Sequence, residues 1–172
     1  MAEAAFQQAR KMEPGNQLML QSYAEYYRAR GENDKAMQLL AESNDSQLLW
    51  RHYFRIGRFD EAVKLLQKMH GDPANRVDAL KGLILVAEQA ADANNVKKYS
   101  DELLTLEDSQ TNRMAQIQAY LNLGLVQEAQ VTLQNFKEKH PYEPRILLME
   151  ALIAKRQGNL DRALDLVDQS LR

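Results

Sequence analysis

The apolar residues of this chain recur at intervals of three and four, which is the spacing of one face of an α-helix. The last segment shows this clearly, with Leu160, Ala163, Leu164, Val167 and Leu171 on one stripe. Four prolines and seven glycines in 172 residues leave long stretches free to be helical. No run alternates apolar and polar residues between turn signals, as a half-buried strand would. The pattern therefore predicts an all-α chain without a sheet.

One spaced pattern occurs several times along the chain. An aromatic or apolar residue is followed by a glycine four residues later, an alanine five residues after that, and a larger apolar residue after four more. The copies are Tyr27, Gly31, Ala36 and Leu40; Tyr53, Gly57, Ala62 and Leu66; Tyr120, Gly124, Ala129 and Leu133; and Ala154, Gly158, Ala163 and Val167. A weaker copy is Ala90, Asn94, Tyr99 and Leu103, and the N-terminus holds only a second half, in Ala2, Phe6, Ala9 and Pro14.

Each position of the pattern has a physical role in a pair of helices. Glycine can take the left-handed backbone conformation that ends a helix. The small alanine lets the second helix approach the first, and the larger residues fill the space between the layers. The pattern therefore predicts a series of helical hairpins.

These copies resemble the tetratricopeptide repeat, a helix–turn–helix unit of about 34 residues. The resemblance covers nearly the whole chain and implies a right-handed α-solenoid of antiparallel helix pairs. It implies eleven helices, one unpaired and then five pairs. The expected units are a partial one at 1–16, followed by 17–42, 43–76, 77–109, 110–143 and 144–172.

Two units are expected to be irregular. The second helix of the second unit is short, roughly residues 34–42, with Asn44 and Asp45 as turn and cap before the next helix. In the fourth unit, Asn94 takes the place of glycine and Tyr99 that of alanine. The first helix has no partner and nothing follows the last, so we expect a fragment of a longer array. Apolar faces at its ends would be exposed, and a dimer partner could cover them.

The chain offers little that points to catalysis. It has no cysteine, and its three histidines, His52, His70 and His140, are not spaced as helical metal ligands are. No glycine-rich phosphate loop occurs. We therefore expect no enzyme activity, no cofactor and no metal, and three histidines that are structural or solvated. The net charge of −2 gives no general attraction to nucleic acid, and no apolar run is long enough for membrane insertion.

The segment 50–58 is the most basic and aromatic part of the chain. Its aromatic residues are Trp50, Tyr53 and Phe54, and its arginines include Arg51 and Arg55. Three interpretations remain open, which are interhelical packing with surface arginines, a protein-docking patch, and nucleic-acid contact. Packing is favoured over docking, and nucleic-acid contact comes last.

The family resemblance also implies a binding surface, because the first helices of tetratricopeptide units line a concave groove where ligands usually lie. It places the following residues there: Gln21, Glu25 and Arg28; Gln47, Arg51, Phe54 and Arg55; Lys81 and Glu88; Met114, Gln118 and Asn122; and Arg145, Leu148 and Lys155. The expected partner is another protein, either a peptide or a folded domain.

The leading expectation is thus a non-catalytic protein–protein interaction scaffold. The irregular units resemble the bacterial periplasmic arrays that serve exopolysaccharide secretion, which favours the periplasm, with the cytoplasm as the alternative. A carbohydrate-guiding module is a second class of function, but it would need aromatic residues along the groove, where only Phe54 stands. A structural or oligomerisation segment is a third class, and it would use outer or terminal faces instead.

Overall fold

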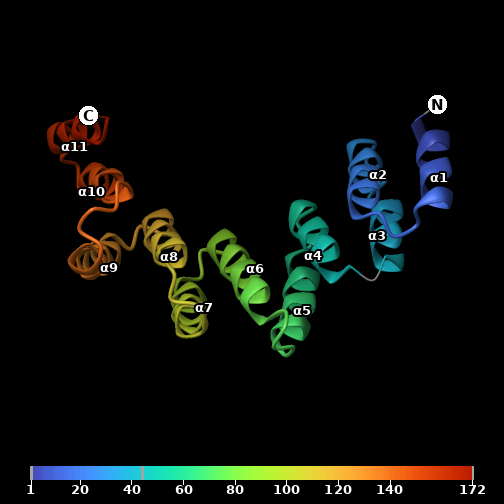
Figure 1. Ribbon diagram of the computed structural model, residues 1–172, viewed down its shortest axis with the longest axis horizontal. Helices are drawn as coiled ribbons and strands as arrows, with labels where there is room; N and C mark the ends of the chain where they lie inside the picture. Colours follow the sequence, from blue (N-terminus) through green and yellow to red (C-terminus); the bar gives the residue numbers. More distant parts are fainter. Residues whose placement is uncertain (1, 44, 172) are drawn as a thin grey trace. The chain divides into compact units, whose positions relative to one another are not determined.

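The structure is a computed structural model that describes residues 2–43 and 45–171. This described part contains eleven α-helices and no strand, as the sequence predicts (Figure 1). The helices are α1 (Ala2–Met12), α2 (Gln17–Ala29), α3 (Asn33–Glu42), α4 (Ser46–Arg55), α5 (Phe59–His70), α6 (Arg76–Gln89), α7 (Ala93–Leu106), α8 (Gln110–Asn122), α9 (Val126–Lys139), α10 (Arg145–Arg156) and α11 (Leu160–Ser170).

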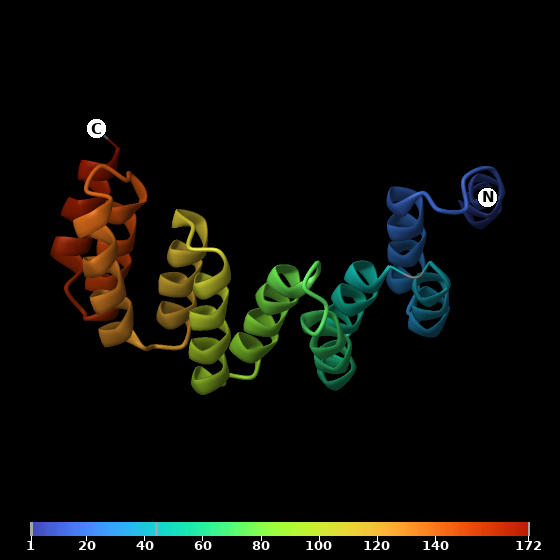
Figure 2. The same ribbon diagram turned by 60° about the horizontal axis from the view of Figure 1, so that its bottom comes forward.

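The chain forms two compact units, residues 1–71 and 72–172. Unit 1 contains α1 and the hairpins α2/α3 and α4/α5, and unit 2 contains the hairpins α6/α7, α8/α9 and α10/α11 (Figures 1 and 2). The hairpin α4/α5 ends at His70, and α6 begins at Arg76.

The core of unit 1 lies between its hairpins and under α1. Ala36 and Ala62, which hold the small position of the repeat, are completely buried. Phe6 of α1 stacks on Tyr23 of α2 with ring centroids 4.7 Å apart, and this contact helps to hold the first helix in place. Trp50 is also buried, so its indole packs inside the unit, as the packing interpretation of this segment requires.

The core of unit 2 is built mainly by α8, α9 and α10. Ala129 again fills the small position, and Phe136 beside it is the largest fully buried side chain. Helix α10 contacts both α8 and α9, and it contributes Ile146 and Ile153 to this core. The hairpin α8/α9 is therefore covered on one side by α10, the first helix of the next hairpin.

The turns confirm the role expected of glycine in four hairpins. Gly31, Gly57, Gly124 and Gly158 all have a positive φ, between 73° and 81°. In the hairpin α2/α3, for example, the backbone N–H of Glu32 donates to the carbonyl of Tyr27 at 2.9 Å and closes the helix end.

The hairpin α6/α7, which is the fourth expected repeat, corrects the expected register. Its left-handed residue is Ala91, with φ of 54°, and the N–H of Asp92 donates to the carbonyl of Ala87 at 2.9 Å. Asn94 instead lies exposed in the first turn of α7, and Tyr99 is only half-buried. Val96, five residues after Ala91, is completely buried, as Ala36 is five residues after Gly31. The copy therefore begins three residues earlier than the sequence suggested.

The short helix α3 and the cap of the following helix α4 agree with the prediction. Helix α3 runs from Asn33 to Glu42, and Asp45 caps α4 by accepting a hydrogen bond of 3.0 Å from the N–H of Leu48. Such a side chain satisfies one of the backbone donors that a helix start leaves unpaired. Asn44, the other residue expected in this turn, lies outside the described residues.

Candidate protein-binding surface

The residues expected in the groove all lie on the first helices of the hairpins. Those of unit 1 are Gln21, Glu25 and Arg28 on α2, and Gln47, Arg51, Phe54 and Arg55 on α4. Those of unit 2 are Lys81 and Glu88 on α6, Met114, Gln118 and Asn122 on α8, and Arg145, Leu148 and Lys155 on α10. Their side chains nevertheless differ in what they contact.

An ion-pair cluster joins α2 to α4 in unit 1. The carboxylate of Glu25 accepts from Arg28 Nε at 2.7 Å and also pairs with the guanidinium of Arg55 on the neighbouring helix. All three side chains are substantially exposed, so water screens the pairs and each stabilises the fold by less than about 1 kcal/mol. Another carboxylate can therefore replace Glu25 beside these arginines at little cost in free energy.

A small depression opens beside this cluster. It has a volume of about 40 Å³ and is lined by Gln21, Ala24, Glu25, Leu40, Leu48, Arg51, His52 and Arg55. The guanidinium of Arg51 lies 5.6 Å from the ring centroid of Trp50, and it forms no ion pair within residues 2–43 and 45–171. The depression thus brings together four predicted residues, Gln21, Glu25, Arg51 and Arg55.

His52 is the polar residue of this depression that sequence reasoning did not assign to the surface. Only 4% of it is exposed, and its Nε2 has no hydrogen-bond partner among the described residues. Burial lowers the pKa of His52, the charge of Arg28 lowers it further, and a hydrogen bond with the Asn33 backbone opposes both. The imidazole is therefore neutral near pH 7. The sequence could have indicated this position, because His52 stands three residues before Arg55 and therefore lies on the same face of the helix.

Two predicted residues of α4 take part in packing instead. The Oε1 of Gln47 accepts a hydrogen bond of 2.8 Å from the indole Nε1 of Trp50. Phe54 is half-buried and meets Phe59 of α5 edge to face, with ring centroids 5.6 Å apart. Both side chains support the hairpin and lie outside the ion-pair cluster.

A polar chain joins α6 to α8 in unit 2. Gln118 Nε2 donates to Asn122 Oδ1, and Asn122 Nδ2 donates to Glu88 Oε2, both at 2.9 Å. Asn122 stands two residues before its turn glycine, as Arg55 does in unit 1. Each unit therefore carries a polar link between successive first helices.

The other predicted residues of unit 2 do not form one site. Lys81 lies 3.7 Å from Glu107, and Arg145 pairs with Glu143 at 2.6 Å and thereby lowers the pKa of that carboxyl. Met114 is only 4% exposed and belongs to the core, because α10 packs over it, so we leave it out of the surface.

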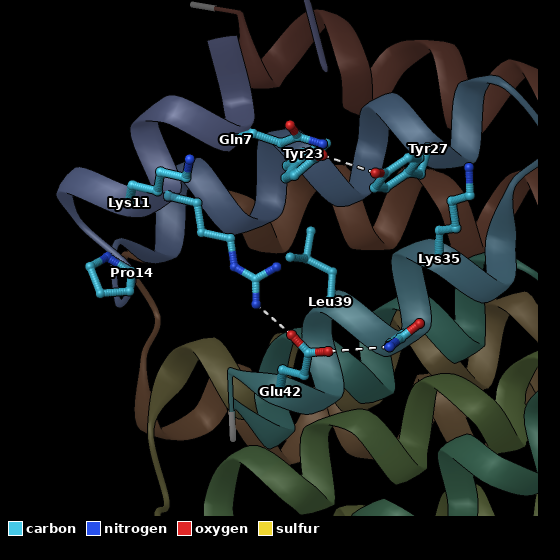
Figure 3. Close-up of a pocket in the computed structure, with 10 residues that line it drawn as sticks. Gln7, Lys11, Pro14, Tyr23, Tyr27, Lys35, Leu39 and Glu42 are labelled. Carbon is cyan, nitrogen blue, oxygen red and sulfur yellow. Dashed lines mark hydrogen bonds and ion pairs between the residues drawn. The ribbon is translucent and has the colours of Figure 1, made fainter. Parts of the chain in front are cut away.

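The largest hollow lies elsewhere, between α1, α2 and α3, and no predicted residue lines it (Figure 3). Its volume is about 590 Å³. Arg10 pairs with Glu42 across it, and the hydroxyls of Tyr23 and Tyr27 lie 2.9 Å apart on its α2 side. The hydrogen bond with Tyr23 and burial together raise the pKa of Tyr27. Because Arg10 already has a partner, the hollow offers few free charges to a ligand.

The described residues hold no group of three or more His, Asp or Glu side chains placed to bind a metal ion. Within the same ranges, no helix is long and apolar enough to cross a membrane.

Comparisons with known proteins agree with this architecture. A tetratricopeptide repeat model matches residues 114–172, and no curated protein sequence matches the chain. A solved tetratricopeptide repeat protein from Parabacteroides merdae is 16% identical with a TM-score of 0.69, over 99% of this chain and 71% of that one. PilW, a type IV pilus biogenesis factor, is 22% identical with a TM-score of 0.66, over 98% and 82% of the two chains.

YrrB, a tetratricopeptide protein described as having an unusual peptide-binding site, is 16% identical with a TM-score of 0.55, over 97% of this chain and 91% of that one. At these identities the structural likeness concerns the fold. Residues 114–172 thus match the tetratricopeptide repeat family, and the chain as a whole has the fold of tetratricopeptide repeat proteins.

Proposed function

We propose that this chain is a non-catalytic protein-interaction scaffold, and that the α2/α4 surface of unit 1 binds an acidic segment of a partner protein. The observation that carries the proposal is the cluster of Arg28, Arg51 and Arg55 around a single carboxylate, Glu25. Three cations against one anion leave this surface with an excess of two positive charges, although the chain as a whole is slightly negative.

The geometry of the depression suits a carboxylate. The guanidinium of Arg51 is unpaired within the described residues, and that of Arg55 shares a carboxylate which an incoming acidic side chain could replace. A volume of about 40 Å³ admits one small group, so the rest of the partner would lie along the helices.

The fold supports the general part of this proposal, because tetratricopeptide repeats generally act as scaffolds for other proteins, and the solved relative YrrB is described by its peptide-binding site. The narrower expectation of a periplasmic exopolysaccharide-secretion module rests on the sequence resemblance alone. A carbohydrate-guiding role is less well supported, since Phe54, the aromatic residue in the expected groove, packs against Phe59.

The test is a selection of binding peptides from a random display library, followed by affinity measurements on variants. We expect acidic peptides to be enriched, and Arg51→Glu with Arg55→Glu to weaken their binding at least tenfold. The matched control is Lys64→Glu with Lys68→Glu, which makes the same change of net charge on exposed residues of α5. Unchanged circular dichroism would show that all the variants are folded.

Two results would contradict the proposal. Peptides without acidic residues would show that the surface recognises something else. Equal binding by the α4 and α5 double variants would show that the total charge matters and the α2/α4 surface does not.

A further inference from the structure

A second large hollow lies in the middle of unit 2, between α7, α8 and α9 (Figure 1). Its volume is about 500 Å³, which is within the range of sites that hold small ligands. Helix α6 packs on α7, and α10 packs on α9, so repeats flank the hollow both before and after it in the chain. Its walls are therefore complete within the described part of unit 2.

The floor of this hollow is formed by two buried polar side chains of α8. Gln116 and Tyr120 are only 6% and 4% exposed. Gln116 Nε2 donates to Asp101 Oδ1 at 3.0 Å and to the hydroxyl of Tyr120 at 3.2 Å. The amide nitrogen carries two hydrogens, so these two bonds use both of them. The floor therefore offers a ligand mainly oxygen acceptors, with the O–H of Tyr120 as a donor.

A carboxylate from each side wall lies near the hydroxyl of Tyr120. Asp101 comes from α7 and Glu128 from α9. Burial raises the pKa of Tyr120, and the negative charges of Asp101 and Glu128 raise it further, while the hydrogen bond from Gln116 opposes them. Neither carboxylate forms an ion pair within residues 2–43 and 45–171. Two unpaired negative charges therefore act on the floor of the hollow.

The lining also contains two cations, and neither of them pairs with these carboxylates. Arg113 is bound by Asp108, with its Nε and Nη2 at 2.5 and 2.6 Å from the two carboxylate oxygens. Lys97 stands one turn before Asp101 on α7 and forms no ion pair in the part of the chain that the structure describes. Because the pair of Arg113 and Asp108 cancels, Asp101 and Glu128 face a single lysine, and the hollow has an excess of negative charge.

The hollow of unit 1 stands at the same place in its repeat but carries other charges. Tyr27 and Tyr120 hold the same position, four residues before their turn glycines. Lys35 and Glu128 likewise both directly precede the small alanine of the repeat. The repeat therefore forms a hollow with a tyrosine at its floor in both units, and the residues of the second helix help to set its charge.

We propose that the hollow between α7, α8 and α9 binds a primary ammonium group, carried by a lysine side chain of a partner protein or by a free polyamine. An ammonium has three donors on a tetrahedral nitrogen, which suits acceptors that come from three helices. A guanidinium suits them less well, because all its donors lie in one plane. This site is separate from the α2/α4 surface and does not depend on the function proposed for it.

The test is an NMR titration of the 172-residue chain, a method that detects the weak binding expected of a single charge. Nα-acetyl-lysine amide represents a lysine side chain, spermidine represents a polyamine, and Nα-acetyl-norleucine amide is the uncharged control. We expect an ammonium probe to shift the side-chain amide signals of Gln116, because this amide binds Asp101 directly. Binding of the lysine probe would identify a protein as the source, and binding of spermidine alone a free polyamine.

Charge variants show whether the residues of the hollow hold the ammonium. Glu128→Gln removes one exposed ion pair and should weaken binding about threefold. Its matched control is Glu138→Gln, because Glu138 is also exposed on α9 but lies outside the hollow. Lys97→Gln should strengthen binding about threefold, since it removes a cation that repels the ligand. Lys98→Gln, the same change at an exposed neighbour outside the lining, should have a smaller effect.

The proposal fails if neither ammonium probe shifts the signals of Gln116, or if the norleucine probe shifts them as much. It fails for an ammonium in particular if Nα-acetyl-arginine amide binds as tightly as the lysine probe. Equal binding by Glu128→Gln and Glu138→Gln would also overturn it, because the total charge of the chain would then account for the binding.

Discussion

Ala91 occupies a backbone conformation that glycine holds in the four other hairpins. Its φ is 54°, whereas Gly31, Gly57, Gly124 and Gly158 have φ of 73° to 81° at the equivalent turn. A Cβ atom in this left-handed region lies too close to the following carbonyl oxygen. We therefore predict that Ala91→Gly stabilises unit 2.

The magnitude follows from two opposing effects. Relief of the left-handed strain is worth about 1 to 2 kcal/mol. Glycine gives back about 0.4 to 1 kcal/mol, because the unfolded chain gains conformational freedom that folding must remove. The midpoints of these ranges give a net gain of about 0.8 kcal/mol in the free energy of unfolding. The side chain of Ala91 is exposed, so no packing is lost.

Denaturant unfolding followed by far-UV circular dichroism measures this change. Trp50 is the only tryptophan and lies in unit 1, so its fluorescence follows that unit and should not respond. Ala90→Gly is the matched control, because Ala90 has φ of −82° and glycine should destabilise that position. The reverse change, Gly124→Ala, should cost about 1 kcal/mol through φ alone, since a Cβ there meets no atom within 4 Å.

The reasoning is refuted if Ala91→Gly lowers the unfolding midpoint as Ala90→Gly does. The two substitutions remove the same methyl group from neighbouring residues, so only the sign of φ distinguishes them. Equal destabilisation would mean that the turn does not hold Ala91 in the left-handed region, and the corrected register of the hairpin α6/α7 would then lose its main support.

Three further predictions concern stability. The pKa of His52 is lowered in the folded state from its usual 6.5, so the unfolded chain binds the proton first and the free energy of unfolding should fall as pH drops below about 6.5. His52→Leu should flatten this part of the pH profile. Denaturant midpoints between pH 7.5 and 5 measure the effect. Phe136→Ala should cost about 3 to 5 kcal/mol in urea unfolding, because the ring is completely buried, whereas Val131→Ala on the same helix should change stability little. Tyr27→Phe removes hydrogen bonds to Tyr23 and Glu3 and should lower the free energy of unfolding by about 1 to 2 kcal/mol, and an unchanged thermal midpoint would contradict this.

The helical hairpins could be predicted from the sequence because their determinants are local. The small residues Ala36, Ala62 and Ala129 were identified from spacing alone, and each is completely buried. The glycines that end the first helices were found in the same way and have the expected positive φ. A few residues in each hairpin suffice to set these features, so no distant contact is needed to recognise them.

The hairpin α6/α7 was misread because residue preference and backbone geometry disagree there. Asparagine tolerates the left-handed conformation better than alanine does, so Asn94 was the better candidate by residue type. The hydrogen bond from Asp92 to Ala87 nevertheless places the turn at Ala91. Val96, with a side chain larger than the usual alanine, then fills the buried position. Because valine stands here where the other copies have alanine, the spacing of alanines did not reveal the register of this copy.

The candidate surface was predicted only in outline, because its contacts join residues far apart in the chain. The sequence placed Glu25 and Arg55 on neighbouring first helices, but not that they pair across 30 positions. It also could not show that Nε2 of His52 is buried without a partner. Such contacts depend on how neighbouring helices pack, and a single sequence contains no direct record of that.

The same dependence explains why one chain can present two kinds of binding chemistry. Met114 and Leu148 hold the same repeat position, yet one is core and the other is exposed, because a helix covers only the first. An uncovered hairpin therefore offers apolar area, whereas the α2/α4 surface, where α4 already covers its neighbour, offers mainly ion pairs. Salt distinguishes the two, because screening weakens binding to the arginines and leaves apolar burial intact. Raising the ionic strength from about 0.05 to 0.5 M should thus release acidic peptides from Arg51 and Arg55.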